Sequence, residues 1–121
     1  MQLKYHDLKG ERSLSASAKR VLGIITLQTL KVSSSAEGES NEFTIVLRKT
    51  HYDTSFPSLT QKRLQELLLV LLKATFSESK LGYHDQPILI EGASSNGDGS
   101  VNLTVSGAYM DCVFKLGCLP A

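Results

Sequence analysis

The sequence lacks the features that mark membrane proteins and disulfide-rich secreted proteins. It contains no tryptophan and only two cysteines, Cys112 and Cys118, which are too few for a disulfide framework. The longest uninterrupted apolar run is Leu67–Leu72, far shorter than the roughly 20 residues that span a bilayer. Residues 1–7 contain no apolar core of signal-peptide length. We therefore expect no membrane partner and a cytoplasmic location.

An excess of charge of one sign is also missing. The chain has 13 Lys and Arg against 12 Asp and Glu, for a formal net charge of +1. This balance argues against a uniformly basic surface, although a local basic patch remains compatible with it. The hydrophobic share of 41% and the charged share of 21% are typical of a globular chain and exclude a wholly disordered one. At 121 residues, we expect a single domain over 1–121.

No catalytic or cofactor motif is complete. The sequence has no G-x-S-x-G elbow and no phosphate-binding glycine loop, and Asn96–Gly99 lacks the acidic residues of a calcium loop. His6, His51 and His84 each lie beside a tyrosine and close to an aspartate, a combination that suits zinc binding or general base catalysis. However, no spacing places two of them on one element, and each lies in a predicted turn. Cys112 lies in a predicted strand, where a thiol is usually inert. We expect no enzyme, no catalytic residue, no metal and no cofactor.

The hydrophobic pattern predicts two hairpins in the N-terminal half. Residues 2–5 and 13–17 alternate around a turn at Gly10, which indicates a first hairpin. Lys19–Val32 is long, apolar and rich in β-branched residues, which favours a strand. After a polar loop over 33–42, Phe43–Lys49 alternates as its antiparallel partner. A register that places Val32 opposite Phe43 collects the apolar side chains on one face.

The C-terminal part is predicted to form a meander of three strands. Pro87–Glu91, Val101–Val105 and Tyr109–Leu116 are the expected strands, and the glycine-rich stretch at Ser94–Gly99 is the clearest turn. With the hairpins, this gives an α+β fold class with an antiparallel β-sheet.

One principal α-helix is predicted over about 58–77, packed on one face of the sheet. Ser58 and Gln61 have the spacing of a capping box. From Leu67 to Leu72 every residue is apolar, around the whole circumference of the helix, whereas a surface helix normally keeps a polar face. Two interpretations stay open: the helix contributes to a dimer, or it is buried at the centre of the fold.

The second predicted hairpin has a polar face that offers a binding surface. Lys31 and Arg48 are suited to phosphates, while Thr29 and Thr44 can form hydrogen bonds with bases and sugars. The alternative is a plain solvated face, which antiparallel sheets commonly keep.

The first half of the chain resembles the coat proteins of single-stranded RNA bacteriophages. The resemblance covers residues 3–50, in the segments Leu3–Ser15, Ile25–Ser34 and Glu42–Lys49, with a serine-rich hairpin followed by an aromatic-Thr-Ile-Val strand. The family implies interleaved helices over a continuous sheet, homodimers that self-assemble into an icosahedral shell, and genomic RNA bound on the inner sheet face.

Two functions are therefore expected. The first is a structural capsid protein of an RNA phage, located in the virion and the host cytoplasm, with RNA-binding residues Thr29, Lys31, Thr44 and Arg48. In that function the dimer interface is formed by Leu67, Leu68, Leu71 and Leu72. The second is a small cytosolic protein-binding module without catalysis, which uses an exposed sheet edge or the helix as its contact.

Overall fold

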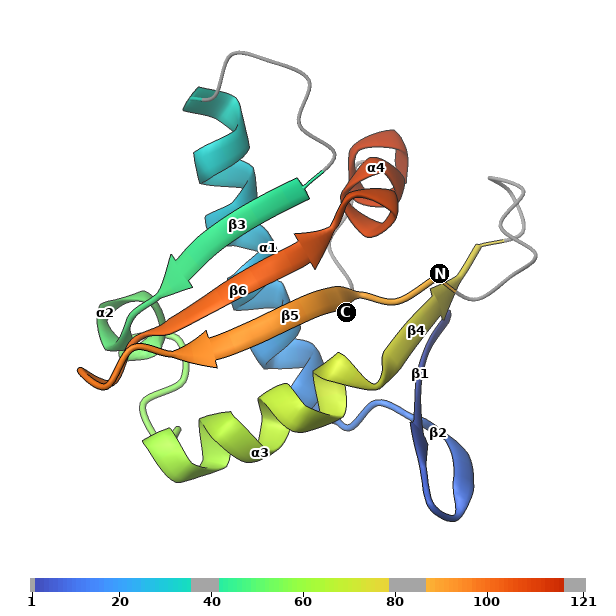
Figure 1. Cartoon of the computed structure of the whole chain (residues 1–121), viewed down its shortest axis with the longest axis horizontal. Coiled ribbons are helices and arrows are strands. Elements are labelled where there is room, and N and C mark those ends of the chain that lie inside the picture. Colours follow the sequence, from blue (N-terminus) through green and yellow to red (C-terminus); the bar gives the residue numbers. More distant parts are fainter. Residues whose placement is uncertain (1, 36–41, 79–86, 117–121) are drawn as a thin grey trace.

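The computed structural model describes residues 2–35, 42–78 and 87–116, and it has an α+β fold with antiparallel sheets (Figure 1). The fold class is therefore confirmed. The elements in chain order are β1 (Gln2–Asp7), β2 (Gly10–Ser13), α1 (Ala16–Ser35), β3 (Glu42–Leu47), α2 (Lys49–Tyr52), α3 (Gln61–Leu72), β4 (Ala74–Ser77), β5 (Ile90–Ser95), β6 (Val101–Ser106) and α4 (Gly107–Leu116).

The first N-terminal hairpin forms as β1 and β2, but its second strand is Gly10–Ser13 rather than residues 13–17, because the helix α1 already begins at Ala16. The two strands pair antiparallel, with Asp7 opposite Gly10 at the turn. Gly10 has a φ of 118°, in the left-handed region that glycine adopts without a steric penalty. Ion pairs across the hairpin join Lys4 to Glu11 at 2.8 Å and Arg12 to Asp7 at 3.0 Å. The hairpin edge is therefore strongly charged.

The predicted strand over Lys19–Val32 is wrong, because these residues lie within helix α1. The helix begins after Ser15, whose Oγ accepts a hydrogen bond from the backbone N–H of Ala18 at 3.2 Å. The buried residues Ala18, Val21, Leu22 and Ile25 repeat at the i, i+3, i+4, i+7 spacing of one helix face. Packing of this face overrides the strand preference of the β-branched residues.

The predicted second hairpin therefore does not form. The strand at its C-terminal side is confirmed as β3, but its partner is β6 and not the segment that ends at Val32. Phe43 lies opposite Val105, and Ile45 lies opposite Leu103. The register proposed from the sequence fails because it assigned to one hairpin two segments that belong to different layers.

The helix predicted over about 58–77 is confirmed for Gln61–Leu72 as α3, with different ends. Its N-cap is Thr60 rather than Ser58, and the Thr60 hydroxyl accepts from the Arg63 N–H at 3.1 Å. The C-terminal part of the predicted helix is instead strand β4, paired with β1. Sheet pairing therefore ends the helix at Leu72.

Two of the three predicted meander strands form a hairpin, but the first of them is Ile90–Ser95 rather than Pro87–Glu91, so it extends into the predicted turn. β5 and β6 pair antiparallel around a turn in which Gly97 and Gly99 have φ values of 80° and 91°. The third predicted strand, Tyr109–Leu116, is wrong and lies in helix α4. Ser106 accepts from the N–H of Tyr109 at 3.4 Å, at the start of this helix.

Within the described residues, six strands form two three-stranded sheets, ordered β2-β1-β4 and β3-β6-β5. The segment before β5 joins them: Ile88 bridges Thr75 of β4, and Leu89 donates its N–H to Ala74 and accepts from the N–H of Ser106. The strand path thus runs β2-β1-β4-β5-β6-β3. Beyond Leu89, β5 separates from β4, and the described residues place no strand on its outer side.

The core lies between the helices and one face of the β3-β6-β5 sheet. Figure 1 shows α1 crossing behind this sheet and α3 running beside β5. α4 is tied to α1 by a buried contact of 3.0 Å between the hydroxyls of Thr26 and Tyr109. The Tyr109 ring packs edge-on against Phe76, with centroids 5.6 Å apart. These two contacts join α4 to α1 and to β4 in the core.

Candidate functional site

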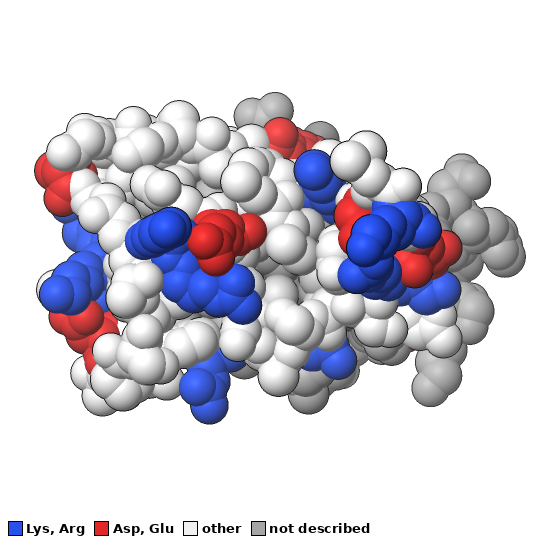
Figure 2. All heavy atoms as spheres, turned by 90° about the horizontal axis from the view of Figure 1, so that it is seen from below, with Lys and Arg blue, Asp and Glu red and all other residues white. Residues whose placement is uncertain are grey.

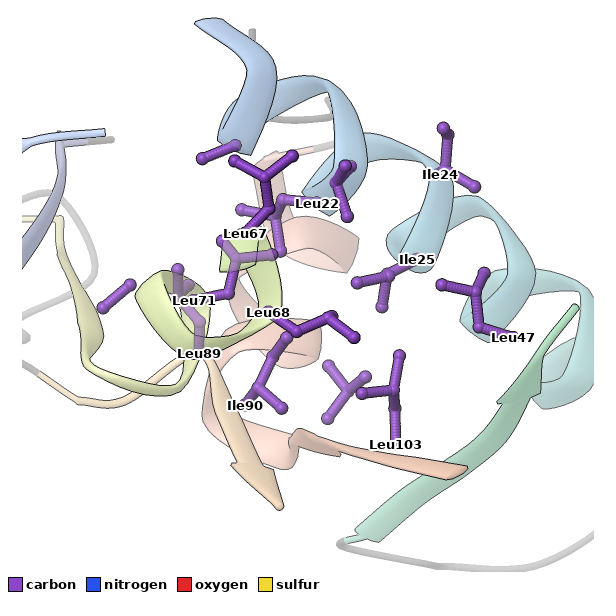
Figure 3. Packing of buried hydrophobic residues seen from close by; sticks show 14 of the residues in the cluster. Leu22, Ile24, Ile25, Leu47, Leu67, Leu68, Leu71, Leu89, Ile90 and Leu103 are labelled. Atoms are coloured by element: carbon purple, nitrogen blue, oxygen red, sulfur yellow. The ribbon is translucent and has the colours of Figure 1, made fainter. Parts of the chain in front are cut away.

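The predicted dimer leucines mostly face the interior of the same chain. Leu67, Leu68 and Leu71 are 2%, 5% and 0% exposed, while Leu72 is half-buried. In Figure 3 the three buried leucines point toward side chains of α1 and of the segment that leads into β5, including Leu22 and Ile90. The assignment of these three residues to a dimer interface is therefore corrected, because strands and helices of their own chain cover them.

The four residues predicted to bind RNA do not share a sheet face. Thr29 is fully buried in α1, and its hydroxyl donates to the carbonyl oxygen of Ile25 at 2.8 Å. Lys31 is also on α1, whereas Thr44 is exposed on β3 and Arg48 follows the end of that strand. The prediction that these residues share one sheet face is wrong, because the segment that carries Thr29 and Lys31 is a helix that packs behind the sheet.

The sheet does keep an open face, but its chemistry does not suit RNA. The residues that share this face are Thr44, Val46, Gly92, Ser94, Asn102 and Thr104. None of these six described residues is charged or aromatic, so the face offers neither phosphate contacts nor base stacking. On the face that Figure 2 shows, acidic and basic side chains lie beside one another, without a broad basic surface.

The structure does bring Lys31 and Arg48 close to a third group, His51. Burial, followed by the positive charges of Arg48 and Lys31, lowers the pKa of His51 below its usual value. The Nδ1 atom of His51 accepts a hydrogen bond from the Arg48 backbone N–H at 3.0 Å, which also requires this nitrogen to be unprotonated. These three residues form a small basic cluster rather than a sheet surface.

The histidines do not assemble a metal centre within the described part of the chain. His6 is on β1 and His51 on α2, and His84 lies outside the described residues. Among residues 2–35, 42–78 and 87–116, no three His, Cys, Asp or Glu side chains gather as ligands. Cys112 is a buried free thiol on α4, and Cys118 also lies outside the described residues.

A shallow, mainly apolar groove lies between α3 and β5, with a volume of about 280 Å³. Its helix wall consists of Gln65, Leu68, Leu69 and Leu72, and its strand wall consists of Ala93, Ser94, Ser95 and Val101. We call this the α3–β5 groove. No residue that lines it is charged. Leu69 is 60% exposed, so a large leucine surface faces the solvent here.

The helix wall of the groove follows from the residue spacing along α3. On α3, Gln65, Leu69 and Leu72 are spaced by four and three residues, so they lie on one stripe of the helix. The inner stripe, which includes Leu67 and Leu71, faces the core. The six-residue apolar run therefore supplies two faces, one buried and one along the groove.

The strand wall is a sheet edge whose residues 92–95 carry neither charge nor proline. Edge strands normally carry charges or proline that discourage pairing with another chain. The β2 edge follows this rule through Glu11 and Arg12, whereas residues 92–95 of β5 are Gly-Ala-Ser-Ser and contain neither. β5 also contains an irregularity between Ile90 and Gly92, after which it runs beside the groove.

Comparison with known proteins gives no match. No protein-family model, no curated protein and no solved structure is similar to this chain. None of the helices in the described residues has the length and apolar character needed to cross a membrane. The geometry of the chain itself is therefore the basis for a function.

The sequence indicated only part of this site. The run Leu67–Leu72 is apolar around the whole helix, which indicates more apolar surface than one buried face needs. Leu69 and Leu72 carry the additional apolar surface, on the side of the groove. The strand wall around Ala93 was missed, since Ser94–Gly99 was interpreted as a turn. Its signal was the small, uncharged composition of residues 92–95.

Proposed function

We propose that the protein is a small, non-catalytic binding module that takes an extended peptide segment of a partner protein into the α3–β5 groove. The peptide adds a strand along the outer edge of β5, and its alternate side chains enter the groove. The observation that carries this proposal is the combination of an unprotected sheet edge with an apolar wall, formed by Leu69 and Leu72, directly beside it.

The backbone of β5 supplies the affinity in this function. An open strand edge presents N–H and C=O groups that pair with an added strand, the mode known as β-augmentation. Residues 92–95 already pair with β6 on their inner side, which holds this part of the strand in an extended conformation. Preorganisation lowers the entropic cost of binding, because only the peptide has to be ordered.

The groove supplies the specificity. A volume of about 280 Å³ lies at the small end of ligand sites, so it holds a few side chains rather than a whole helix. Side chains of an added strand alternate, so residues i and i+2 of the peptide point into the groove. The uncharged lining favours apolar residues at these two positions and disfavours charged ones.

The coat-subunit function, with homodimers, shell assembly and packaged RNA, stays a prediction from the resemblance. Its physical basis is a helix that its own chain leaves uncovered, and this condition does not hold for Leu67, Leu68 and Leu71. Size-exclusion chromatography with light scattering separates the two functions. A particle containing nucleic acid supports the coat subunit, and a monomer supports the binding module.

The peptide-binding proposal is tested with a random peptide library displayed on phage and selected against the immobilised full chain. We expect selected sequences to carry apolar residues two positions apart. The variant Leu69→Glu places a charge in the groove and is expected to weaken the binding of a selected peptide at least tenfold. Leu27→Glu is the matched control, because Leu27 is also an exposed leucine on a helix, at 46% exposure on α1.

Three results contradict the proposal: a failure to select any peptide, equal weakening by the two variants, or full binding by Leu69→Glu. Circular dichroism spectra of both variants confirm that the fold is intact before the affinities are compared.

A further inference from the structure

A second pocket lies at the far end of α3 and is chemically unlike the α3–β5 groove. It has a volume of about 670 Å³ and is formed where α2, the start of α3 and the β5–β6 turn meet. This volume falls within the range of pockets that hold small organic ligands. Its lining contains two cations and two carboxylates: Arg48, Lys49, Asp53 and Asp98.

The two cations are adjacent in sequence and have no ion-pair partner among the described residues. By contrast, Lys4, Arg12, Arg63 and Lys115 each pair with a carboxylate at 2.8–3.1 Å. Arg48 and Lys49 lie at the mouth of a pocket instead, at the junction of β3 and α2. Two adjacent cations can contact the oxygens of a phosphate monoester, which carries a charge of about −1.5 to −2 at pH 7.

The two carboxylates have different roles. The Oδ1 atom of Asp98 accepts hydrogen bonds from both the N–H and the hydroxyl of Ser100, at 2.9 and 2.5 Å. These bonds, together with the positive charge of Arg48, lower the pKa of Asp98, so it stays ionised and holds the turn in place. The Asp53 side chain has no such bonds within the described residues. It is therefore the acceptor available to a ligand.

The β5–β6 turn that lines this pocket is held by hydrogen bonds of its own. Gly99 has a φ of 91°, which favours glycine, and a Cβ at this position would lie 3.6 Å from the side-chain nitrogen of Gln61. A side chain at this position would therefore reach Gln61 at the start of α3, so the turn and the helix lie close to one another. The backbone N–H of Asn96 donates a hydrogen bond to the carbonyl oxygen of Ser100 at 3.0 Å. The pocket is thus shaped before any ligand arrives.

We propose that this pocket binds a phosphate monoester of a hydroxylated small molecule, such as a sugar phosphate or a nucleotide. Its phosphate contacts Arg48 and Lys49, and a hydroxyl group donates to Asp53. Inorganic phosphate alone fills only part of the volume and leaves Asp53 without a donor. This site is separate from the α3–β5 groove, and its test stands independently of peptide binding.

Ribose 5-phosphate, ribose and inorganic phosphate are the three probes, and NMR amide shifts of the full chain are the measurement. We expect saturable shifts at Lys49, Gly99 and Ser100 with ribose 5-phosphate, weaker binding of inorganic phosphate, and no binding of ribose. Lys49→Gln is expected to weaken the binding of ribose 5-phosphate at least tenfold. The matched control is Lys9→Gln, an exposed lysine in the β1–β2 turn, which should leave the affinity unchanged.

Asp53→Asn separates the phosphate contact from the hydroxyl contact. This variant should weaken the binding of ribose 5-phosphate severalfold, while the affinity for inorganic phosphate stays unchanged or rises slightly. The site is refuted if ribose 5-phosphate produces no saturable shifts at millimolar concentration, or if Lys9→Gln weakens it as much as Lys49→Gln. The ligand class is refuted if inorganic phosphate binds as tightly as ribose 5-phosphate and Asp53→Asn changes neither of these two affinities.

Discussion

The two faces of α3 should differ sharply in their contribution to stability. Leu71 is fully buried by its own chain, and Leu69 is 60% exposed in the groove. Leu71→Ala removes buried methyl groups and leaves a cavity, which costs about 2–5 kcal/mol of the free energy of unfolding. Leu69→Ala removes mostly exposed atoms and is expected to change the free energy of unfolding by about 0.5 kcal/mol or less.

Urea denaturation followed by circular dichroism measures both variants against the wild type. A domain of this size is typically stable by about 5–15 kcal/mol, so Leu71→Ala should remain folded in water while its midpoint falls clearly. The measurement is repeated at two protein concentrations a hundredfold apart. Because the leucine is covered within one chain, the midpoint should not depend on concentration. Equal losses for Leu69→Ala and Leu71→Ala, or a midpoint that rises with concentration, would refute this packing and favour a subunit interface.

Two further predictions concern the α1–α4 contact and pH. The Thr26–Tyr109 contact predicts a coupling of about 1 kcal/mol in a double-mutant cycle of Thr26→Val and Tyr109→Phe, and additive losses would show that the hydroxyls do not interact. Because the pKa of His51 is lowered in the fold, the unfolded chain binds its proton more readily, and stability should fall as pH drops through about 6.5 toward that lowered pKa. His51→Asn should reduce this pH dependence in urea denaturation between pH 8 and pH 5, and an unchanged slope would contradict the assignment.

The sequence predicted the elements whose signals are local. The hairpin at Gly10, strand β6 and the central turns of α3 follow from alternation, turn residues and capping. α1 was assigned wrongly because β-branched composition was given more weight than spacing. The helical signal was nevertheless present in the Ser15 cap and in the i, i+3, i+4, i+7 spacing that begins at Ala18.

Other parts depend on contacts between distant segments and could not be derived from local pattern. β4 is a strand because it pairs with β1 on one side and bridges Ile88 on the other, although it continues a helical sequence. The α3–β5 groove joins Leu69 to Ala93, and its shape exists only after both elements have packed on α1. The apolar run was therefore detected, but the surface that it faces was not.

The groove is tested most directly by NMR of the labelled protein with a selected peptide. If the peptide adds a strand to β5, the backbone amides of Gly92, Ala93, Ser94 and Ser95 should shift and show cross-strand nuclear Overhauser contacts to the peptide backbone. The methyl groups of Leu69 should contact an apolar side chain of the same peptide. Shifts confined to the open sheet face around Thr44 and Thr104, with no contact between the peptide and residues 92–95, would contradict the proposed function.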